Sequence, residues 1–342
     1  VGQLGLGNTT YYSSPKQVGA LTTWSSVASG PNHTVSIKTD GTLWSWGGNN
    51  QGQLGLGNKT YYSSPKQVGA LTNWLSVSCG TYYTVSIKTD GTLWSWGYNP
   101  FGQLGLGYTN YYSSPKQVGA LTNWSSVSCG QYHTVSIKTD GTLWSWGSSA
   151  YGQLGLGNTT NYSSPKQVGA LTNWSSVSCG AFYTVSIKTD GTLWSWGRNN
   201  YGQLGLNNTT YYSSPKQIGA LTNWSSVSCG YQHTISIKTD GTLWSWGINH
   251  VGQLGLGNIT YYSSPKQVGA LTNWSSISCG VAQAVAIKTD GTLWAWGYNL
   301  YGQLGLNNVT NYSSPKQVGA LTSWTKLFKG CKSWATLAIK SS

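Results

Sequence analysis

The fold is decided by residues 34–47, which read TVSIKTDGTLWSWG. Polar and β-branched residues alternate over residues 34–38, as in a strand with one buried face. Asp40-Gly41 follows, and bulky and small residues alternate again over residues 43–46. An Asp-Gly pair between two alternating runs is the strongest short-range hairpin signal, and it predicts a type I′ turn with positive φ at both residues. The segment therefore predicts a β-hairpin.

Two further strands are predicted on either side of this hairpin. Bulky and small residues alternate from Trp24 to Gly30, which favours a strand before the hairpin. After it, a Gly-rich and Pro-containing loop runs from Gly52 to Pro65, and a shorter fourth strand is expected at Lys66–Val68. We therefore expect four short strands in about 50 residues.

This unit is repeated along the whole chain of 342 residues. The string GQLGL begins at residues 2, 52, 102, 152, 202, 252 and 302, and SSPKQ recurs seven times at the same interval. TLWSWG occurs at 42, 92, 142, 192 and 242 and as TLWAWG at 292, so the array holds one such segment fewer than it holds units. A fixed period of this size is typical of repeat architectures. We expect a single domain over residues 1–342.

A radial arrangement of the units is favoured. One twisted four-stranded sheet cannot bury both its faces, whereas seven sheets around an axis bury each face against a neighbour. The prediction is an all-β, seven-bladed β-propeller with four short antiparallel strands in each blade. A solenoid is the alternative, but it needs polar caps and six of the seven units are nearly interchangeable. We assign the two tryptophans of TLWSWG to packing between blades; a sugar-stacking platform is the alternative.

The motifs GQLGLG, SPKQV and VSCGxxHTVSIKTDGTLWSWGxN resemble the repeat of the regulator of chromosome condensation family, over essentially the entire chain. The resemblance implies a seven-bladed β-propeller. Members of that family include a nucleotide exchange factor for a Ran-type GTPase and secreted bacterial inhibitors of β-lactamase. The sequence shows neither the basic N-terminal tail of the exchange factor nor an insertion like its GTPase-contacting wedge. Fold alone does not choose among these functions.

Closure of the ring is left open by the sequence, because one blade is one strand short. The strand lies upstream of Val1, or the blade holds three strands, or a partner adds a strand to an open edge and so joins an oligomer or larger assembly. Because Val1 is not Met, we expect a processed product or a segment of a longer protein. The last unit differs at residues 328–334, which we interpret as a terminal adaptation.

The titratable residues argue against an enzyme. All six acidic residues are aspartates in the same predicted turn, with no glutamate in the chain, so no carboxylate pair is expected. His33, His133 and His233 share a position that is Tyr or Gln in other units, which suits packing or recognition. We predict no catalytic residue, no metal site and no cofactor.

The cysteines are expected to be small buried side chains. Cys79, Cys129, Cys179, Cys229 and Cys279 are equivalent positions, and Cys331 stands apart. A spacing of 50 residues matches no zinc motif, and a whole blade between equivalent residues disfavours disulfides. A metal-lined axial ring is the alternative. GQLGLG lacks the Lys-Ser/Thr and the helix of a phosphate-binding loop.

The net charge of +13 is spread in rings rather than clustered. Lysines occupy the SPKQ position and the strand end before each Asp-Gly, where we expect only weak exposed pairs with the aspartates. Arg198 is the sole arginine. Specific nucleic-acid recognition is therefore not expected. No apolar run is long enough for a membrane-spanning helix.

Variation between the units is concentrated in two stretches: the three residues after the strand glycine, such as residues 81–83, and the four residues after TLWSWG, such as residues 98–101. In an antiparallel meander these two loops emerge on one face of the disc. Aromatic and arginine side chains in loops are typical of binding surfaces; drift in tolerant loops is the alternative. The candidate binding residues are His33, Tyr82, Tyr83, Phe101, Tyr132, His133, Tyr151, Phe182, Tyr183, Arg198, Tyr201, Tyr231, His233, His250, Tyr298 and Tyr301.

Three functions are compatible with this pattern. The first is a non-enzymatic module that binds a protein or glycan through the variable face, outside the cytoplasm, as an adhesin, cell-surface or virion component. The second is an intracellular regulator of a small GTPase, with exchange-factor activity. The third is an architectural subunit that assembles through the incomplete blade. The sequence favours the first.

Overall fold

Each repeat unit folds into a four-stranded antiparallel sheet in the computed structural model, which describes residues 1–20, 23–327 and 335–340. In the first sheet the strands are β1 (Trp24–Ser29), β2 (His33–Lys38), β3 (Leu43–Gly47) and β4 (Tyr62–Gln67), paired in chain order. Five further blades repeat this arrangement: β5 (Trp74–Cys79), β6 (Tyr83–Lys88), β7 (Leu93–Gly97), β8 (Tyr112–Gln117); β9 (Trp124–Cys129), β10 (His133–Lys138), β11 (Leu143–Gly147), β12 (Tyr162–Gln167); β13 (Trp174–Cys179), β14 (Tyr183–Lys188), β15 (Leu193–Gly197), β16 (Tyr212–Gln217); β17 (Trp224–Cys229), β18 (His233–Lys238), β19 (Leu243–Gly247), β20 (Tyr262–Gln267); β21 (Trp274–Cys279), β22 (Gln283–Lys288), β23 (Leu293–Gly297) and β24 (Tyr312–Gln317).

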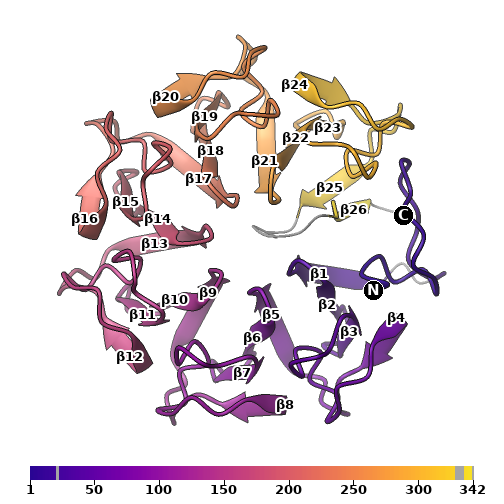
Figure 1. Ribbon diagram of the computed structural model, residues 1–342, viewed down its shortest axis with the longest axis vertical. Coiled ribbons are helices and arrows are strands. Elements are labelled where there is room, and N and C mark those ends of the chain that lie inside the picture. Colours follow the sequence, from indigo (N-terminus) through magenta and orange to yellow (C-terminus); the bar gives the residue numbers. More distant parts are fainter. Residues whose placement is uncertain (21–22, 328–334, 341–342) are drawn as a thin grey trace.

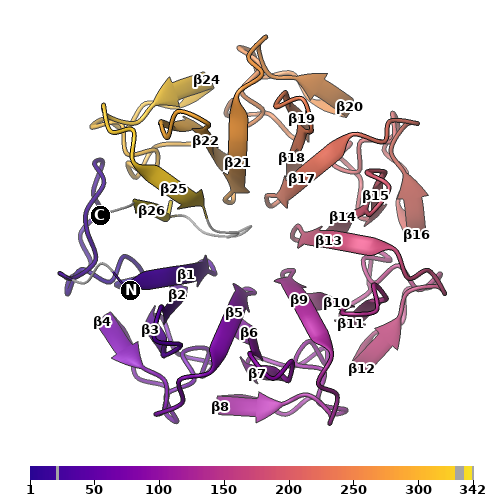
Figure 2. The same ribbon diagram turned by 180° about the vertical axis from the view of Figure 1, so that it is seen from behind.

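The sheets stand around a common axis (Figures 1 and 2). Their first strands are innermost, and each contacts the first strand of the next blade. A two-stranded sheet, β25 (Trp324–Leu327) with β26 (Ala338–Lys340), occupies the seventh position. The predicted all-β propeller is therefore confirmed, with six complete blades and a partial seventh. No helix in the described part of the chain is long and apolar enough to cross a membrane.

The core consists of layers between neighbouring blades. Val35 and Leu43 of the first blade pack with Trp74 and Trp96 of the second, and equivalent clusters recur around the ring. The second tryptophan of each TLWSWG is fully buried or nearly so. The predicted role of these tryptophans in packing between blades is thus confirmed, and it removes the largest side chains of the chain from water.

The GQLGL loop ties each blade to the next. The carbonyl of Gln53 accepts hydrogen bonds from Trp96 Nε1 (2.9 Å) and Thr84 Oγ1 (2.9 Å) of the following blade. Gly55 has φ of 75°, and a Cβ built on it would lie 2.8 Å from Trp96 Nε1. A side chain at this position would therefore collide with the indole, which explains the glycine in the first six copies.

The hairpin between the second and third strands is correct in position but differs in turn type. Only Gly41 has positive φ, and Lys38 N donates to Thr42 O (3.0 Å) across a three-residue loop. This is the pattern of a hairpin whose last loop residue is a left-handed glycine, so the type I′ prediction was wrong. Asp40 Oδ1 accepts bonds from Thr42 N (2.9 Å) and Thr42 Oγ1 (2.6 Å), which confirms the aspartates as turn residues.

The fourth strand is longer than the sequence indicates. It begins at Tyr62 rather than Lys66 and includes Pro65. Because this strand is the outer edge of its sheet, a proline that donates no hydrogen bond is tolerated there.

The N-terminal segment stands at the outer rim of the seventh blade (Figures 1 and 2). Gln3 O accepts bonds from Thr34 Oγ1 (2.9 Å) and Trp46 Nε1 (3.0 Å), as Gln53 O does one blade later. Asn307 N donates to Ser13 O (2.7 Å), the counterpart of the bond from Asn207 N to Ser263 O. Residues 1–17 thus hold the loop and fourth-strand positions, and no described residue forms a third strand there. The predicted terminal adaptation at 328–334 lies outside the described residues.

Candidate functional site

The two variable stretches of each unit lie on the same face of the disc. Tyr98 N donates to Tyr82 O (2.9 Å), and Arg198 N donates to Phe182 O (2.9 Å), so the loops are directly hydrogen-bonded. We call this side the loop face, and the opposite side, formed by the Asp-Gly hairpins, the hairpin face. The predicted common face is confirmed, and the backbone bond exists whichever side chains the two loops carry.

Aromatic side chains form a connected band over blades two to five of the loop face. Neighbouring ring centroids in this band lie 5.0–6.5 Å apart, in tilted and edge-on arrangements. We call this set the aromatic band: Tyr82, Tyr98, Phe101, Tyr111, Tyr132, Tyr151, Phe182, Tyr211 and Tyr231. All its members are partly or largely exposed. The band therefore offers rigid aromatic area to a partner at low entropic cost.

Arg198 lies against the middle of the band. Its guanidinium carbon is 5.1 Å from the ring centroid of Tyr151 and 5.7 Å from that of Phe182. Its Nε is buried and makes no hydrogen bond within the described residues. Burial raises the pKa of Tyr231, and the charge of Arg198 opposes that rise. Arg198 is thus a partly exposed cation held against aromatic rings, a suitable partner for a carboxylate.

Five of the candidate binding residues are buried and do not belong to the exposed face, which corrects the sequence prediction. These are His33, Tyr83, His133, Tyr183 and His233, all at 0% exposure. The first residue of each second strand points between blades, and four of these five side chains form hydrogen bonds with the following blade. Tyr83 Oη donates to His133 O, and His33 Nε2 lies 3.2 Å from Thr84 Oγ1.

Burial also removes any acid–base role from two of these histidines. It lowers the pKa of His33 from 6.5 to about 3, and it lowers the pKa of His233 to the same value. Both rings are therefore neutral at ordinary pH and serve the packing between blades.

Four other candidates are exposed or partly exposed but lie outside the band. Tyr201 contacts Tyr261, with centroids 5.8 Å apart. Tyr301 stacks on Tyr11 at 5.3 Å and meets Tyr298 edge-on at 6.1 Å. The remaining candidate, His250, is exposed beside Gln253.

Three members of the band are absent from the candidate residues: Tyr98, which lies in a variable stretch, and Tyr111 and Tyr211, which extend the band outward. Tyr111 lies 5.0 Å from Tyr98, and Tyr211 lies 5.8 Å from Tyr151. Both are the first tyrosine of the YYSSP loop, which varies little and therefore drew no attention. A signal was present, because this position is Asn161 in another unit.

The lysines of the hairpin face do not form the exposed ion pairs with the aspartates that the sequence predicts. Lys38 Nζ lies 3.8 Å from the ring centroid of Trp44 and 5.4 Å from that of Trp24, and the same sandwich recurs in five further blades. These lysines are 5–9% exposed. Cation–π contact and burial of the aliphatic chain, rather than ion pairing, determine their place.

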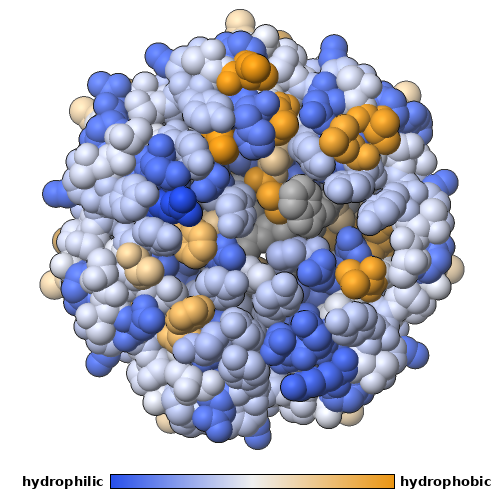
Figure 3. Space-filling model, viewed as in Figure 1, coloured by the Kyte–Doolittle hydropathy of each residue, from blue (hydrophilic) through white to orange (hydrophobic). Residues whose placement is uncertain are grey.

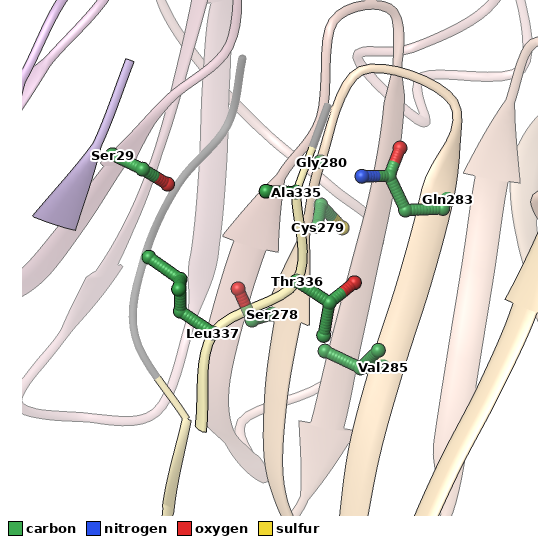
Figure 4. A pocket seen from close by; sticks show the side chains of 9 residues that line it. All are labelled: Ser29, Ser278, Cys279, Gly280, Gln283, Val285, Ala335, Thr336 and Leu337. Atoms are coloured by element: carbon green, nitrogen blue, oxygen red, sulfur yellow. The ribbon is translucent and has the colours of Figure 1, made fainter. Parts of the chain in front are cut away.

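The axial region offers little room for a ligand. The five equivalent cysteines are buried, as predicted, and Cys179 Sγ lies 3.3 Å from Ser128 O of the preceding blade. A cavity of about 10 Å³, lined by Cys279, Gln283 and Thr336 among others, has room for about one water molecule (Figure 4). Within the described ranges no three His, Cys or Asp side chains are grouped so as to hold a metal ion.

Hydrophobic residues form separate patches on the largely hydrophilic face shown in Figure 3. No single apolar area dominates the side that is shown. Recognition on such a face would depend on specific side chains rather than on bulk hydrophobicity.

The model of the "Regulator of chromosome condensation (RCC1) repeat" matches seven times, at residues 1–37, 40–87, 90–137, 140–187, 190–237, 240–287 and 290–333. The chain belongs to the RCC1 repeat family. A second model of the same repeat matches six times, from residues 24–53 to residues 274–303. The RCC1 repeats thus cover nearly the whole chain, with the same 50-residue period as the GQLGL motif.

Solved RCC1-type structures share the fold. Human WBSCR16 superposes with a TM-score of 0.83 at 24% identity, over 94% of this chain and 89% of that chain. Prp20p from Saccharomyces cerevisiae, described with its binding to Gsp1p and histones, gives 0.78 at 20% identity, over 93% and 83%. Yeast RCC1 (Prp20) bound to Kap60 gives 0.78 at 19% identity, over 90% and 78%. No curated protein sequence matches this chain. At these identities the similarity shows the fold alone.

Proposed function

We propose that this RCC1-type propeller is a non-enzymatic binding module that holds a protein partner through the aromatic band. The observation that carries the proposal is the continuity of the band: nine aromatic side chains from four blades contact one another, and Arg198 lies against them. Aromatic residues and arginine are the side chains that dominate the binding energy of protein interfaces.

The chemistry of the face defines the partner further. The six aspartates belong to the hairpin face, so the described part of the loop face presents no carboxylate to oppose an acidic ligand. Arg198 Nε would gain a partner from a carboxylate next to an apolar or aromatic group. We therefore propose a protein segment with an acidic residue beside a hydrophobic anchor. A glycan is the competing ligand, and a location outside the cytoplasm stays a prediction.

The proposed function is non-enzymatic because of the state of the titratable groups. Each Asp at a hairpin accepts two bonds from the threonine two residues on, and these bonds hold its pKa below the usual value. His33 and His233 are neutral and buried. Neither set is arranged for proton transfer to a substrate.

Regulation of a small GTPase is the second candidate. It is supported by the similarity in fold to Prp20p, which is described as binding Gsp1p. This candidate places the chain inside a cell and predicts faster release of a bound guanine nucleotide.

The test exchanges residues between units so that the scaffold is preserved. Tyr82, Tyr132 and Phe182 are each replaced by Asn, the residue at position 32, and Tyr98 is replaced by Gly, as at position 48. Ligands are selected from a displayed protein library and from a glycan array. We expect protein ligands whose affinity falls at least about a hundredfold in this variant, since several hot-spot side chains are lost together.

The control likewise installs residues of the first unit, but outside the band: Tyr298→Gly and Tyr301→Gln, as at positions 48 and 51. It should retain full affinity. Ligands that are all glycans, or affinity that survives the band exchange, would reject the proposal. Accelerated nucleotide release from a GTPase panel, lost in the same variant, would favour the second candidate instead.

A further inference from the structure

The aromatic band is richer in hydrogen-bond donors than in acceptors. Seven of its nine members are tyrosines, whose hydroxyls each carry a donor, and Arg198 adds a guanidinium. The carbonyls of the variable stretch are already paired, because Ser148 N donates to Tyr132 O (2.8 Å) and Arg198 N donates to Phe182 O (2.9 Å). The six aspartates lie on the hairpin face. A ligand that complements this surface therefore offers many carbonyl oxygens and few N–H groups.

Among the common conformations of a bound peptide, the polyproline II helix has this property. Its carbonyls have no partner within the peptide, and a proline has no N–H that would need an acceptor. An α-helix pairs its own carbonyls, so a helical ligand would cover the tyrosine hydroxyls without bonding to them. A β-strand ligand needs an open sheet edge, and the outer strands of the complete blades lie at the rim of the disc (Figures 1 and 2). Proline-rich segments also dock on aromatic side chains elsewhere.

The spacing of the rings sets the length of the ligand. From Tyr98 the row of rings runs to Tyr132 (6.0 Å), then to Phe182 (6.5 Å), and from there to the guanidinium carbon of Arg198 (5.7 Å). Tyr98 and Arg198 are thus no more than about 18 Å apart, which about six residues of polyproline II span at about 3.1 Å each. A ligand that follows this row meets the guanidinium at one end of its contact only.

We propose that the partner segment is a proline-rich polyproline II helix of about six residues with an acidic residue at the end that lies over Arg198. Its proline rings pack on Tyr98, Tyr132 and Phe182, its carbonyls accept bonds from the tyrosine hydroxyls, and its carboxylate meets the guanidinium. This inference rests on the proposed function, because it specifies the conformation and the chemistry of the ligand of the same band.

The first experiment selects ligands without assuming their sequence. A displayed library of random twelve-residue peptides is selected on the chain as it stands, with counter-selection on the band-exchange variant (Tyr82→Asn, Tyr98→Gly, Tyr132→Asn, Phe182→Asn). Band-dependent peptides should carry at least three prolines in a run of about six residues, with Asp or Glu at one end of the run. Band-dependent peptides without this pattern, such as those with apolar residues at i, i+3, i+4 and i+7, would overturn the inference and leave the proposed function standing. A selection without any band-dependent peptide would reject both.

The second experiment tests the polar contacts with the tightest selected peptide, by fluorescence polarisation. Arg198→Ser installs the residue of position 148 and should weaken this peptide at least about tenfold, but leave the affinity of its acid-to-Gln version unchanged. Tyr132→Phe installs the residue of position 182, keeps the ring and removes the hydroxyl, and should weaken binding about three- to tenfold. A peptide with Ala at each proline should bind at least about tenfold more weakly, because it is not preformed in polyproline II.

The pair Tyr298→Gly and Tyr301→Gln is the control, and it should bind every peptide as the original chain does. Equal losses for the acidic peptide and its Gln version in Arg198→Ser would contradict the carboxylate contact. Unchanged affinity in Tyr132→Phe would contradict the contact between hydroxyl and carbonyl, and unchanged affinity of the Ala peptide would contradict the conformation. Each of these three results overturns the inference.

Discussion

The loop face and the hairpin face are built from opposite ends of the same strands, yet only the loop face varies between units. At the hairpin end, the sequence Thr-Asp-Gly-Thr of residues 39–42 is identical in six units. Three of these residues have a structural role there, because Asp40 accepts both bonds of Thr42 and a Cβ on Gly41 would lie 2.0 Å from Thr72 O.

At the loop end, backbone atoms rather than side chains form the contact between the two variable loops. The bond between Gly48 N and Asn32 O is made equally by Tyr98 with Tyr82 and by Arg198 with Phe182. Side chains at these positions are therefore free to differ without loss of the fold. The comparison teaches that the hairpin face carries stability and the loop face carries specificity, and the following predictions test that division.

The largest effect is expected from a substitution on the hairpin face. Gly141→Ala would put a Cβ 2.0 Å from Thr172 O at φ of 75°, and should lower the free energy of unfolding by about 3 to 5 kcal/mol. Gly169→Ala is the matched control, because Gly169 has φ of 63° with open space around it, and it should cost only about 1 kcal/mol. Urea unfolding followed by circular dichroism measures both. Equal losses would contradict the assigned role of the hairpin glycine.

The second effect is a loss of stability in mild acid through the buried histidines. His33 and His233 have a pKa of about 3 in the folded chain and 6.5 as the reference value, so the unfolded state binds more protons between these values. Above pH 6.5 both states carry neutral histidines and the folded state has its full stability. As the pH falls from 6.5 toward 3, protonation of the unfolded state lowers the free energy of unfolding. Together they should cost about 2 to 3 kcal/mol between pH 6 and pH 5.

The double variant His33→Gln, His233→Gln installs the residue that Gln283 represents in another unit. Between pH 6 and pH 5 the free energy of unfolding of this variant should fall by about 2 to 3 kcal/mol less than that of the original chain. Hydrogen bonds from threonine lower the pKa of the aspartates, so these residues lose their contribution at more acid pH. An unchanged slope would show that the histidines do not resist protonation.

A smaller effect is expected for the lysine sandwich on the hairpin face. Lys138→Gln removes a cation 3.8 Å from the ring centroid of Trp144 and should cost about 1 to 2 kcal/mol. Lys166→Gln is the control, since Lys166 is exposed on the outer strand and lies 5.6 Å from the ring of Tyr162. It should change stability by less than about 0.5 kcal/mol. The two variants are compared by denaturant midpoint at low and high salt.

The smallest effect on stability belongs to the loop face. Tyr132→Asn installs the residue of position 32 and should change the free energy of unfolding by no more than about 0.5 to 1 kcal/mol. Val135→Ala, in the strand β10 that follows Tyr132, removes part of a fully buried side chain and should cost about 2 kcal/mol. A large loss for Tyr132→Asn would mean that the band supports the fold rather than a partner.

Prediction from sequence succeeded where it depended on local pattern. The alternation of residues 34–38 and 43–46, together with the Asp-Gly pair, was sufficient for the hairpin, and the 50-residue period was sufficient for the radial arrangement. The common face of the variable loops follows from the antiparallel order of the strands. It therefore needed no knowledge of side-chain contacts.

The candidate site was predicted only in part. Tyr82 and Tyr83 are adjacent in one variable stretch and look equivalent as candidates, yet Tyr82 joins the band and Tyr83 is buried. Tyr83 shares the strand parity of Val85 and Ile87, which was an available signal. Tyr111 was not predicted, because its contact with Tyr98 joins the two ends of the long connection between β7 and β8, whose path the sequence does not reveal.

The sequence by itself determined the number of units, the four-strand pattern and the end of the strands at which the units differ, because these properties follow from short-range periodicity. The tertiary structure alone decided the turn type and the choice between neighbouring tyrosines. Those outcomes depend on contacts with the following unit, as the close approach of Thr72 O to Gly41 illustrates. Contacts between blades are not encoded in the pattern of any one repeat.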